Sequence, residues 1–142
     1  MSNEEKIKAE KIVAKMMESD RFSQWLGISV VTAEPGHCIL KMKIREEMLN
    51  GFGIAHGGIA FSLADSALAF ASNAYGRLSV ALECSISFPI AVNVNDELTC
   101  EAKELSLTNK TATYLMEVKN QKGENVAFFK GTVYRTSKEW SY

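Results

Sequence analysis

The chain has 142 residues, of which 46% are hydrophobic and 23% charged, and its formal net charge is −1. This length suits one domain spanning 1–142, and the composition is that of a globular protein without disordered or low-complexity tracts. The near-neutral charge gives no basic field for nucleic acid or for an anionic membrane, so we expect neither partner.

The cysteines and histidines argue against a disulfide-stabilised or metal-dependent protein. Three cysteines, an odd number, lie in apolar contexts at Cys38, Cys84 and Cys100. They favour reduced, buried thiols and a cytoplasmic location. The first ten residues mix acids and bases without an apolar core, unlike a signal peptide. The two histidines and three cysteines lack metal-ligand spacing, so we expect no metal and no cofactor.

The N-terminal residues 1–26 are predicted to be helical. From Asn3 to about Ser19, apolar residues recur at helical spacing, with two acids in the first turn. Arg21 to Leu26 continues the pattern, and Gly27 ends it.

Six stretches with the period-two alternation or the β-branched content of strands follow. The first stretch after Gly76 is expected to place alternate residues, from Val80 through Leu82 and Cys84 to Phe88, on one face. Short turns between neighbours predict antiparallel pairing. We therefore expect an α+β fold in which a sheet of about six strands surrounds one long helix. The predicted strands are 28–33, 38–44, 80–88, 98–103, 112–119 and 126–135.

The helix predicted from Gly57 to Tyr75 is apolar or small on every side and has one charged residue, Asp65. A helix of this kind is buried, and its serines and asparagine disfavour a membrane span. Asp65 is therefore expected in a buried setting, where a lone charge is costly. It is either a hydrogen-bonded structural group or a functional carboxylate.

Two glycines, Gly57 and Gly58, begin this helix. The first amides of a helix lack intrahelical partners, so bare glycines could let a ligand oxygen approach them as in an oxyanion site. The alternative is steric, because glycine lets a crowded turn form. His56 could bind ligand or local carbonyls, and Asn50 before Gly51 is also an ordinary turn signal.

The spacing of Gly58 and Asp65 restricts how they could act together. At 1.5 Å per residue they lie about 10 Å apart along the helix, too far to act on one reacting carbon. If both are catalytic, each site takes its helix start from one subunit and Asp65 from another. A symmetric dimer with two identical sites is then expected.

The spaced residues Asn50-Gly51, His56-Gly57-Gly58 and Leu63-Ala64-Asp65 resemble the motif of hotdog-fold acyl-CoA thioesterases. The subgroup most similar to the chain is the phenylacetate-degradation (PaaI-type) one. Phe88 and Gly131 also fall where that family has comparable residues, and the resemblance extends from about Gly27 to Arg135.

The resemblance implies a hotdog fold, with dimers formed by sheet-edge pairing and usually joined into tetramers. It implies that Asp65 activates water or attacks the thioester carbon, and that an amide of Gly57 or Gly58 polarises the carbonyl. Asn50 would place the nucleophile or carbonyl, and His56 would support the loop.

The substrate would be a medium-sized or aromatic, phenylacetyl-like acyl-CoA. The aromatic residues Phe52, Phe61, Phe70 and Tyr75 could line the acyl pocket or simply belong to the core. Candidates for holding the CoA phosphates are Lys110, Arg77 and Arg135, of which only Lys110 fits the family pattern; the alternative for all three is solvated surface charge.

The sequence departs from the family at two turns. No basic residue lies between Pro89 and Asp96, and Asn95 and Asn109 replace glycines that are common there. Asparagine is the next best residue for a left-handed backbone, so both turns can form.

Two other functions are compatible with a hotdog fold. A non-catalytic acyl-CoA-binding protein would keep the groove without Asp65 chemistry, although the intact Asp65 and Gly57-Gly58 argue against it. A dehydratase or hydratase would need a histidine and an acid over the acyl chain, and no second histidine lies near His56.

Overall fold

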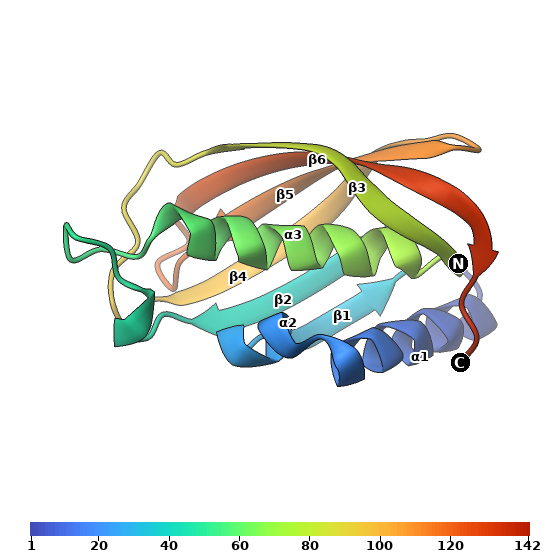
Figure 1. The fold of residues 1–142 in the computed structure, drawn as a ribbon, viewed down its shortest axis with the longest axis horizontal. Helices are drawn as coiled ribbons and strands as arrows, with labels where there is room; N and C mark the ends of the chain where they lie inside the picture. Colours follow the sequence, from blue (N-terminus) through green and yellow to red (C-terminus); the bar gives the residue numbers. More distant parts are fainter.

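The computed structural model describes residues 1–142 and has one antiparallel six-stranded sheet curled around a long helix, α3 (Figure 1). This is the hotdog fold that the resemblance implies. The spatial order of the strands is β1-β2-β4-β5-β6-β3, so β1 and β3 form the two edges. The strands are β1 (Ser29–Glu34), β2 (His37–Lys43), β3 (Arg77–Ser87), β4 (Glu97–Leu107), β5 (Thr111–Lys119) and β6 (Asn125–Glu139).

The helices also follow the prediction. The N-terminal segment forms α1 (Asn3–Ser19) and α2 (Arg21–Leu26), and a 3-10 turn, η1 (Glu46–Met48), precedes α3 (Gly57–Asn73). No helix in the structure has the length and apolarity needed to cross a membrane.

The central helix ends at Asn73, two residues before the predicted Tyr75. The buried Asn73 side chain joins this end to the next strand, because its Oδ1 accepts from Ser79 N–H at 2.9 Å and its Nδ2 donates to Ser79 O at 3.1 Å. Trp140 Nε1–H also donates to Asn73 Oδ1 at 2.7 Å. These bonds satisfy polar groups that burial would otherwise leave unpaired.

Gly131 in β6 lies directly against α3. A Cβ added at Gly131 would lie 2.6 Å from Leu68 Cδ2, so a side chain at this position would displace Leu68 from its place in the core. Phe61 of α3 packs edge-on against Phe129 of β6, with ring centroids 5.0 Å apart.

One prediction about β3 was wrong. Val80 and Leu82 were expected on the same face as Cys84, but they are 48% and 60% exposed. The pairing with β6 skips a residue between Ala81 and Glu83, so Leu82 lies in a bulge and the alternation changes phase there. A bulge inserts one extra residue into a strand, which turns the preceding side chains to the other face.

The β3 edge has no partner strand in the single chain and carries exposed apolar side chains, including Val80 and Leu82. An unpaired apolar edge of this kind offers backbone hydrogen-bonding groups and apolar area to another chain.

Candidate functional site

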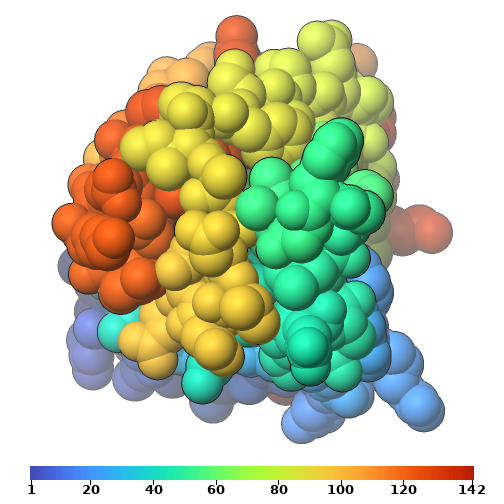
Figure 2. All heavy atoms as spheres, turned by 90° about the vertical axis from the view of Figure 1, so that its left-hand side faces the viewer, coloured from blue at the N-terminus to red at the C-terminus, as the bar shows by residue number.

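Three loops come together at the end of the molecule where α3 begins. Figure 2 shows them in one face: residues 45–56 in teal and green, the segment between β3 and β4 in yellow, and the turn between β5 and β6 in orange. In Figure 1 this is the left-hand end. Ala55 N–H donates to Val92 O at 2.8 Å and so joins the first two loops.

His56 occupies the N-cap of α3. Its Nδ1 accepts a hydrogen bond from Gly58 N–H at 2.9 Å. Because a backbone amide can only donate, Nδ1 carries no proton, and the proton of the neutral ring is on Nε2. Of the two amides considered as oxyanion donors, that of Gly58 is therefore occupied, whereas Gly57 N–H makes no hydrogen bond within the chain.

The ring of Phe88, just after β3, lies against Gly57. A Cβ added at Gly57 would be 3.1 Å from Phe88 Cζ, closer than most real Cβ contacts. The absence of a side chain at position 57 thus lets the aromatic ring approach the helix start. The steric and the oxyanion interpretations of this glycine are compatible with each other.

Asn50 shapes the loop before the helix. Its Oδ1 accepts from Phe52 N–H at 2.9 Å and from Ile54 N–H at 3.4 Å, which leaves the side-chain NH₂ free to donate. Asn50, His56 and Gly57 line one pocket of about 270 Å³. The other lining residues are mostly apolar: Ile54, Ala55, Ala60, Phe88, Ile90, Ala91 and Val92.

Asp65 is exposed, whereas its neighbours in α3, Ala64 and Ser66, are buried, so it lies on an uncovered side of the helix. The expectation that Asp65 is buried is wrong for the single chain, although the helix itself is buried. Small or partly exposed residues one turn away, Ser62 and Ala69, continue this uncovered side.

The Asp65 carboxylate has no hydrogen-bond or ion-pair partner in the chain. Partial burial of the carboxylate and, to a lesser extent, repulsion from Asp20 raise its pKa above the ordinary value. The residue as a whole is exposed, so this burial of the carboxylate is only partial. A free carboxylate with a raised pKa is well suited to accept a proton from water.

Gly57 and Asp65 are separated by eight positions on one straight helix, or about 12 Å. The structure therefore brings Asn50, His56 and Gly57 together and leaves Asp65 apart from them in the single chain.

The two predicted substrate-binding residues are also apart from that pocket. Phe61 is partly buried against Phe129. Lys110 is in the turn between β4 and β5, whereas the loop with Asn50 follows β2 at the other end of the sheet. The length of β4 places Lys110 about 30 Å from that loop.

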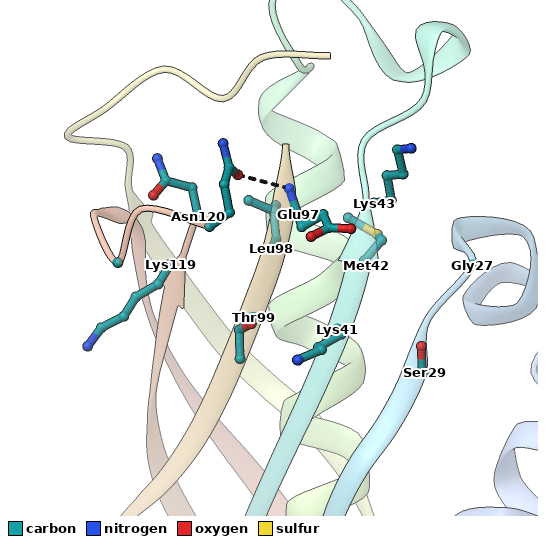
Figure 3. Close-up of a pocket in the computed structure, with 12 residues that line it drawn as sticks. Gly27, Ser29, Lys41, Met42, Lys43, Glu97, Leu98, Thr99, Lys119 and Asn120 are labelled. Carbon is teal, nitrogen blue, oxygen red and sulfur yellow. Dashed lines mark hydrogen bonds between the residues drawn. The ribbon is translucent and has the colours of Figure 1, made fainter. Parts of the chain in front are cut away.

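A larger pocket of about 670 Å³ lies on the outer face of the sheet, lined mainly by polar side chains. Figure 3 shows it over β2 and β4, with α3 behind the strands and with Lys41, Thr99 and Lys119 on its floor. No predicted site residue lines it, so we do not assign the candidate site to this pocket.

Sequence reasoning missed the contacts that hold the site loop against α2. Arg45 donates from Nη1 to Leu26 O at 3.1 Å and from Nη2 to Trp25 O at 2.6 Å. Its guanidinium lies 5.0 Å from the centre of the Trp25 ring. These groups satisfy carbonyls at the end of α2. The partners are 19 and 20 residues apart in sequence, so no local pattern indicates them.

The thioesterase superfamily model matches residues 52–127 of the chain, from the site loop through the start of β6. This chain belongs to the thioesterase superfamily. A putative esterase of Archaeoglobus fulgidus is 42% identical over 131 residues, which are 92% of this chain and 85% of that protein.

Solved structures of superfamily members agree with the fold. The Escherichia coli PaaI protein has a TM-score of 0.93 with 34% identity, covering 96% of this chain and 99% of that one. A hypothetical thioesterase of Streptococcus pneumoniae, solved with coenzyme A, has a TM-score of 0.83 with 26% identity, covering 89% and 98%.

Proposed function

We propose that this superfamily member hydrolyses acyl-CoA thioesters to a free acid and CoA, as the name of PaaI, acyl-coenzyme A thioesterase, says of that relative. The observation that carries the proposal is the pocket at the start of α3. There the unoccupied Gly57 amide and the free Asn50 NH₂ are two donors for a thioester carbonyl oxygen.

The reaction assigns one role to each residue. The Gly57 amide polarises the carbonyl and stabilises the oxyanion, and Asn50 places the carbonyl or the nucleophile. In one route Asp65 takes a proton from water, the water oxygen bonds to the carbonyl carbon, and the C–S bond breaks to release the free acid and the CoA thiolate, which takes up the proton. In the other route Asp65 attacks the carbonyl carbon itself, the C–S bond breaks to release the CoA thiolate, and water then hydrolyses the mixed anhydride to the free acid and regenerates Asp65. His56 caps α3 and holds the Gly58 amide, which fixes the start of the helix.

Each site is proposed to form between two subunits. The separation of about 12 Å within one helix excludes direct action of Gly57 and Asp65 of one chain on one carbon. Pairing of two β3 edges would cover Val80 and Leu82 and bring the uncovered side of one α3 toward the other. The assembly is a homodimer with two identical sites, and we propose a dimer of dimers in the cytoplasm.

The acyl group is proposed to be medium-sized or aromatic, of the phenylacetyl class. The apolar lining of the pocket of about 270 Å³ supports an apolar acyl chain. Phe61 does not line this pocket, and its proposed role is to contact the acyl chain where the chain extends beyond it. Lys110 lies too far from the pocket of its own chain, so it would meet the CoA phosphates of a site in another subunit.

The test is release of free CoA thiol from a panel of phenylacetyl-, benzoyl-, hexanoyl- and acetyl-CoA by the wild type and by Asp65→Asn. We expect the substitution to lower kcat by about 10²- to 10⁴-fold, which is the usual contribution of a general base. Glu97→Gln is the matched control, since Glu97 is exposed and forms no ion pair.

Equal rates for the wild type and Asp65→Asn would exclude the proposed role of Asp65. If the wild type binds acyl-CoA saturably but releases no thiol from any ester, the protein is instead a non-catalytic acyl-CoA-binding member of the fold.

A further inference from the structure

A chain of hydrogen bonds links the N-terminal helices to α3 one residue away from Asp65. Asp20 lies at the junction of α1 and α2, and its Oδ1 accepts from Ser23 N–H at 2.9 Å. Asp20 Oδ2 accepts from the Ser23 hydroxyl at 2.6 Å. The Ser23 hydroxyl is in turn 2.8 Å from the hydroxyl of Ser66 in α3.

The donor and acceptor of each of these hydrogen bonds follow from the number of protons available. A carboxylate only accepts, so the single Ser23 hydroxyl proton goes to Asp20. Ser66 must then donate to Ser23 Oγ. Ser23 and Ser66 are 1% and 9% exposed, so both hydroxyls lie where an unpaired group is costly. The three residues therefore form a satisfied polar contact that fixes α2 against α3.

Asp20 is the charged residue that acts on Asp65 in the single chain. No other residue of α3 is charged, and neither carboxylate is neutralised by a cation. On the β3 side the titratable neighbour is Cys84. Burial, then the charges of Asp65 and Glu83, raise the pKa of this thiol, so it stays neutral.

We propose that Asp20 is a positioning residue of the hydrolytic site, which holds the N-terminal helices on α3 through Ser23 and Ser66 and places a second negative charge beside Asp65. This inference rests on the proposed function for its effect on hydrolysis. Its effect on the protonation of Asp65 is independent of that function.

The consequence is a stronger base at position 65. Repulsion between two carboxylates favours the protonated form of Asp65, so Asp20 adds to the burial that raises the Asp65 pKa. Asp65 must be ionised to accept a proton, so the acidic limb of the kcat/KM profile follows its pKa. Removing the Asp20 charge should move that limb to lower pH and weaken the base.

The experiment is the pH profile of kcat/KM for the wild type and Asp20→Asn. Asparagine caps helices about as well as aspartate, so this variant should fold. We expect the acidic limb to move to lower pH and the plateau to fall by about two- to five-fold, as expected for a modestly weaker base. Asp20→Glu keeps the charge and should keep the acidic limb close to that of the wild type.

Glu18→Gln is the matched control, because it changes the net charge equally at an exposed position near the end of α1. It should leave the limb unchanged. The inference would be overturned if the acidic limb of the kcat/KM profile stayed in place in Asp20→Asn, or if it moved equally in Glu18→Gln.

A measurement without turnover separates this inference from the proposed function. The Asp65 carboxyl carbon can be titrated by NMR in the wild type and in Asp20→Asn. A lower titration midpoint in the variant supports the role of Asp20 even if Asp65→Asn hydrolyses acyl-CoA normally. An unchanged midpoint contradicts it even if the enzyme is active.

Discussion

The polar groups at the start of α3 differ in whether they already have partners. His56 Nδ1 and Gly58 N–H satisfy each other, and Asn50 Oδ1 holds its own loop. Gly57 N–H and the Asn50 NH₂ remain free. At the scale of the residue, the loop is therefore pre-organised by its acceptors and offers donors to a ligand. This is what stabilisation of a developing negative charge requires.

Gly57→Ala tests the first of these donors. The added methyl would lie 3.1 Å from Phe88 Cζ, so the ring or the helix start must move by a few tenths of an ångström. We expect kcat/KM for the best acyl-CoA to fall by about 10- to 100-fold, because small displacements of catalytic groups are costly. The measurement is steady-state thiol release.

Gly51→Ala is the control for this substitution, because a Cβ added there meets no atom within 4 Å. It should retain nearly the wild-type rate. If Gly57→Ala were as active as Gly51→Ala, the helix start would not contact the substrate.

At the scale of the element, α2 connects two parts of the proposed site. Arg45 fastens the loop with Asn50 to the carbonyl end of α2, and Ser23 fastens the other side of α2 to Ser66. A helix of six residues has little stability alone, so these side-chain contacts determine its position.

The sheet has its own cross-strand contact at His37 of β2. Its Nε2 lies 2.8 Å from Glu101 of β4 and its Nδ1 lies 3.3 Å from Glu34 of β1. The hydrogen bond with His37 and the nearby Lys103 outweigh burial and lower the pKa of Glu101. The pair is solvent-accessible, so its contribution to stability is small.

The stability of the wild type and of Glu101→Gln, compared as the pH is lowered, tests this contact. Because the pKa of Glu101 is lower in the folded than in the unfolded protein, ionised Glu101 stabilises the fold at pH values above the unfolded pKa of 4.5. This stabilisation is lost as the pH falls through the folded pKa. The wild type should therefore be more stable than Glu101→Gln at pH 6. The difference should vanish below the folded pKa, which urea unfolding at several pH values can measure.

Glu97→Gln on the same strand serves as control, since Glu97 has no ion-pair partner and should show no such pH-dependent difference. A constant difference between the wild type and Glu101→Gln at every pH would show that the contact with His37 does not depend on the Glu101 charge.

At the scale of the whole molecule, the uncovered side of α3 and the unpaired β3 edge support assembly with a second copy. If each site takes Gly57 from one subunit and Asp65 from the other, two inactive variants should complement each other. Hybrids of Asp65→Asn and Gly57→Val would contain one intact site per dimer. A random mixture should regain about a quarter of the wild-type activity, because half of its dimers are hybrids.

Differently tagged subunits allow the hybrids to be isolated and assayed for thiol release. Isolated hybrids that are as inactive as the parents would contradict a shared site. Leu82→Lys on the β3 edge should lower both the oligomer mass in light scattering and the recovered activity. Val31→Lys on the β1 edge, also at an exposed apolar position, should lower neither.

The loop that contains the candidate pocket could be predicted because its residues are close in sequence. Asn50, His56 and Gly57 are within eight positions of one another, so their meeting needs only a local turn. Asn95 was likewise correctly expected to tolerate a left-handed backbone, and its φ is 69°. The strands and helices followed from hydrophobic periodicity, which the local chain determines.

The features that the sequence did not predict depend on contacts between segments that are distant along the chain. The Leu82 bulge follows from pairing of β3 with β6 and reverses the face of Val80, which alternation alone cannot show. Asp20 and Ser23 reach α3 only because α2 folds back across it, 43 positions away in the case of Ser23 and Ser66.

The sequence by itself determined the order of the elements, the resemblance to hotdog thioesterases and the identity of the single charged residue in α3. These properties depend on spacing along the chain and on helix rise. Only the tertiary structure decided that Asp65 is uncovered, that Gly57 rather than Gly58 has the free amide, and that Asp20 lies beside Asp65. Exposure, hydrogen-bond partners and electrostatic neighbours depend on which surfaces meet in space, and one-dimensional periodicity does not encode those meetings.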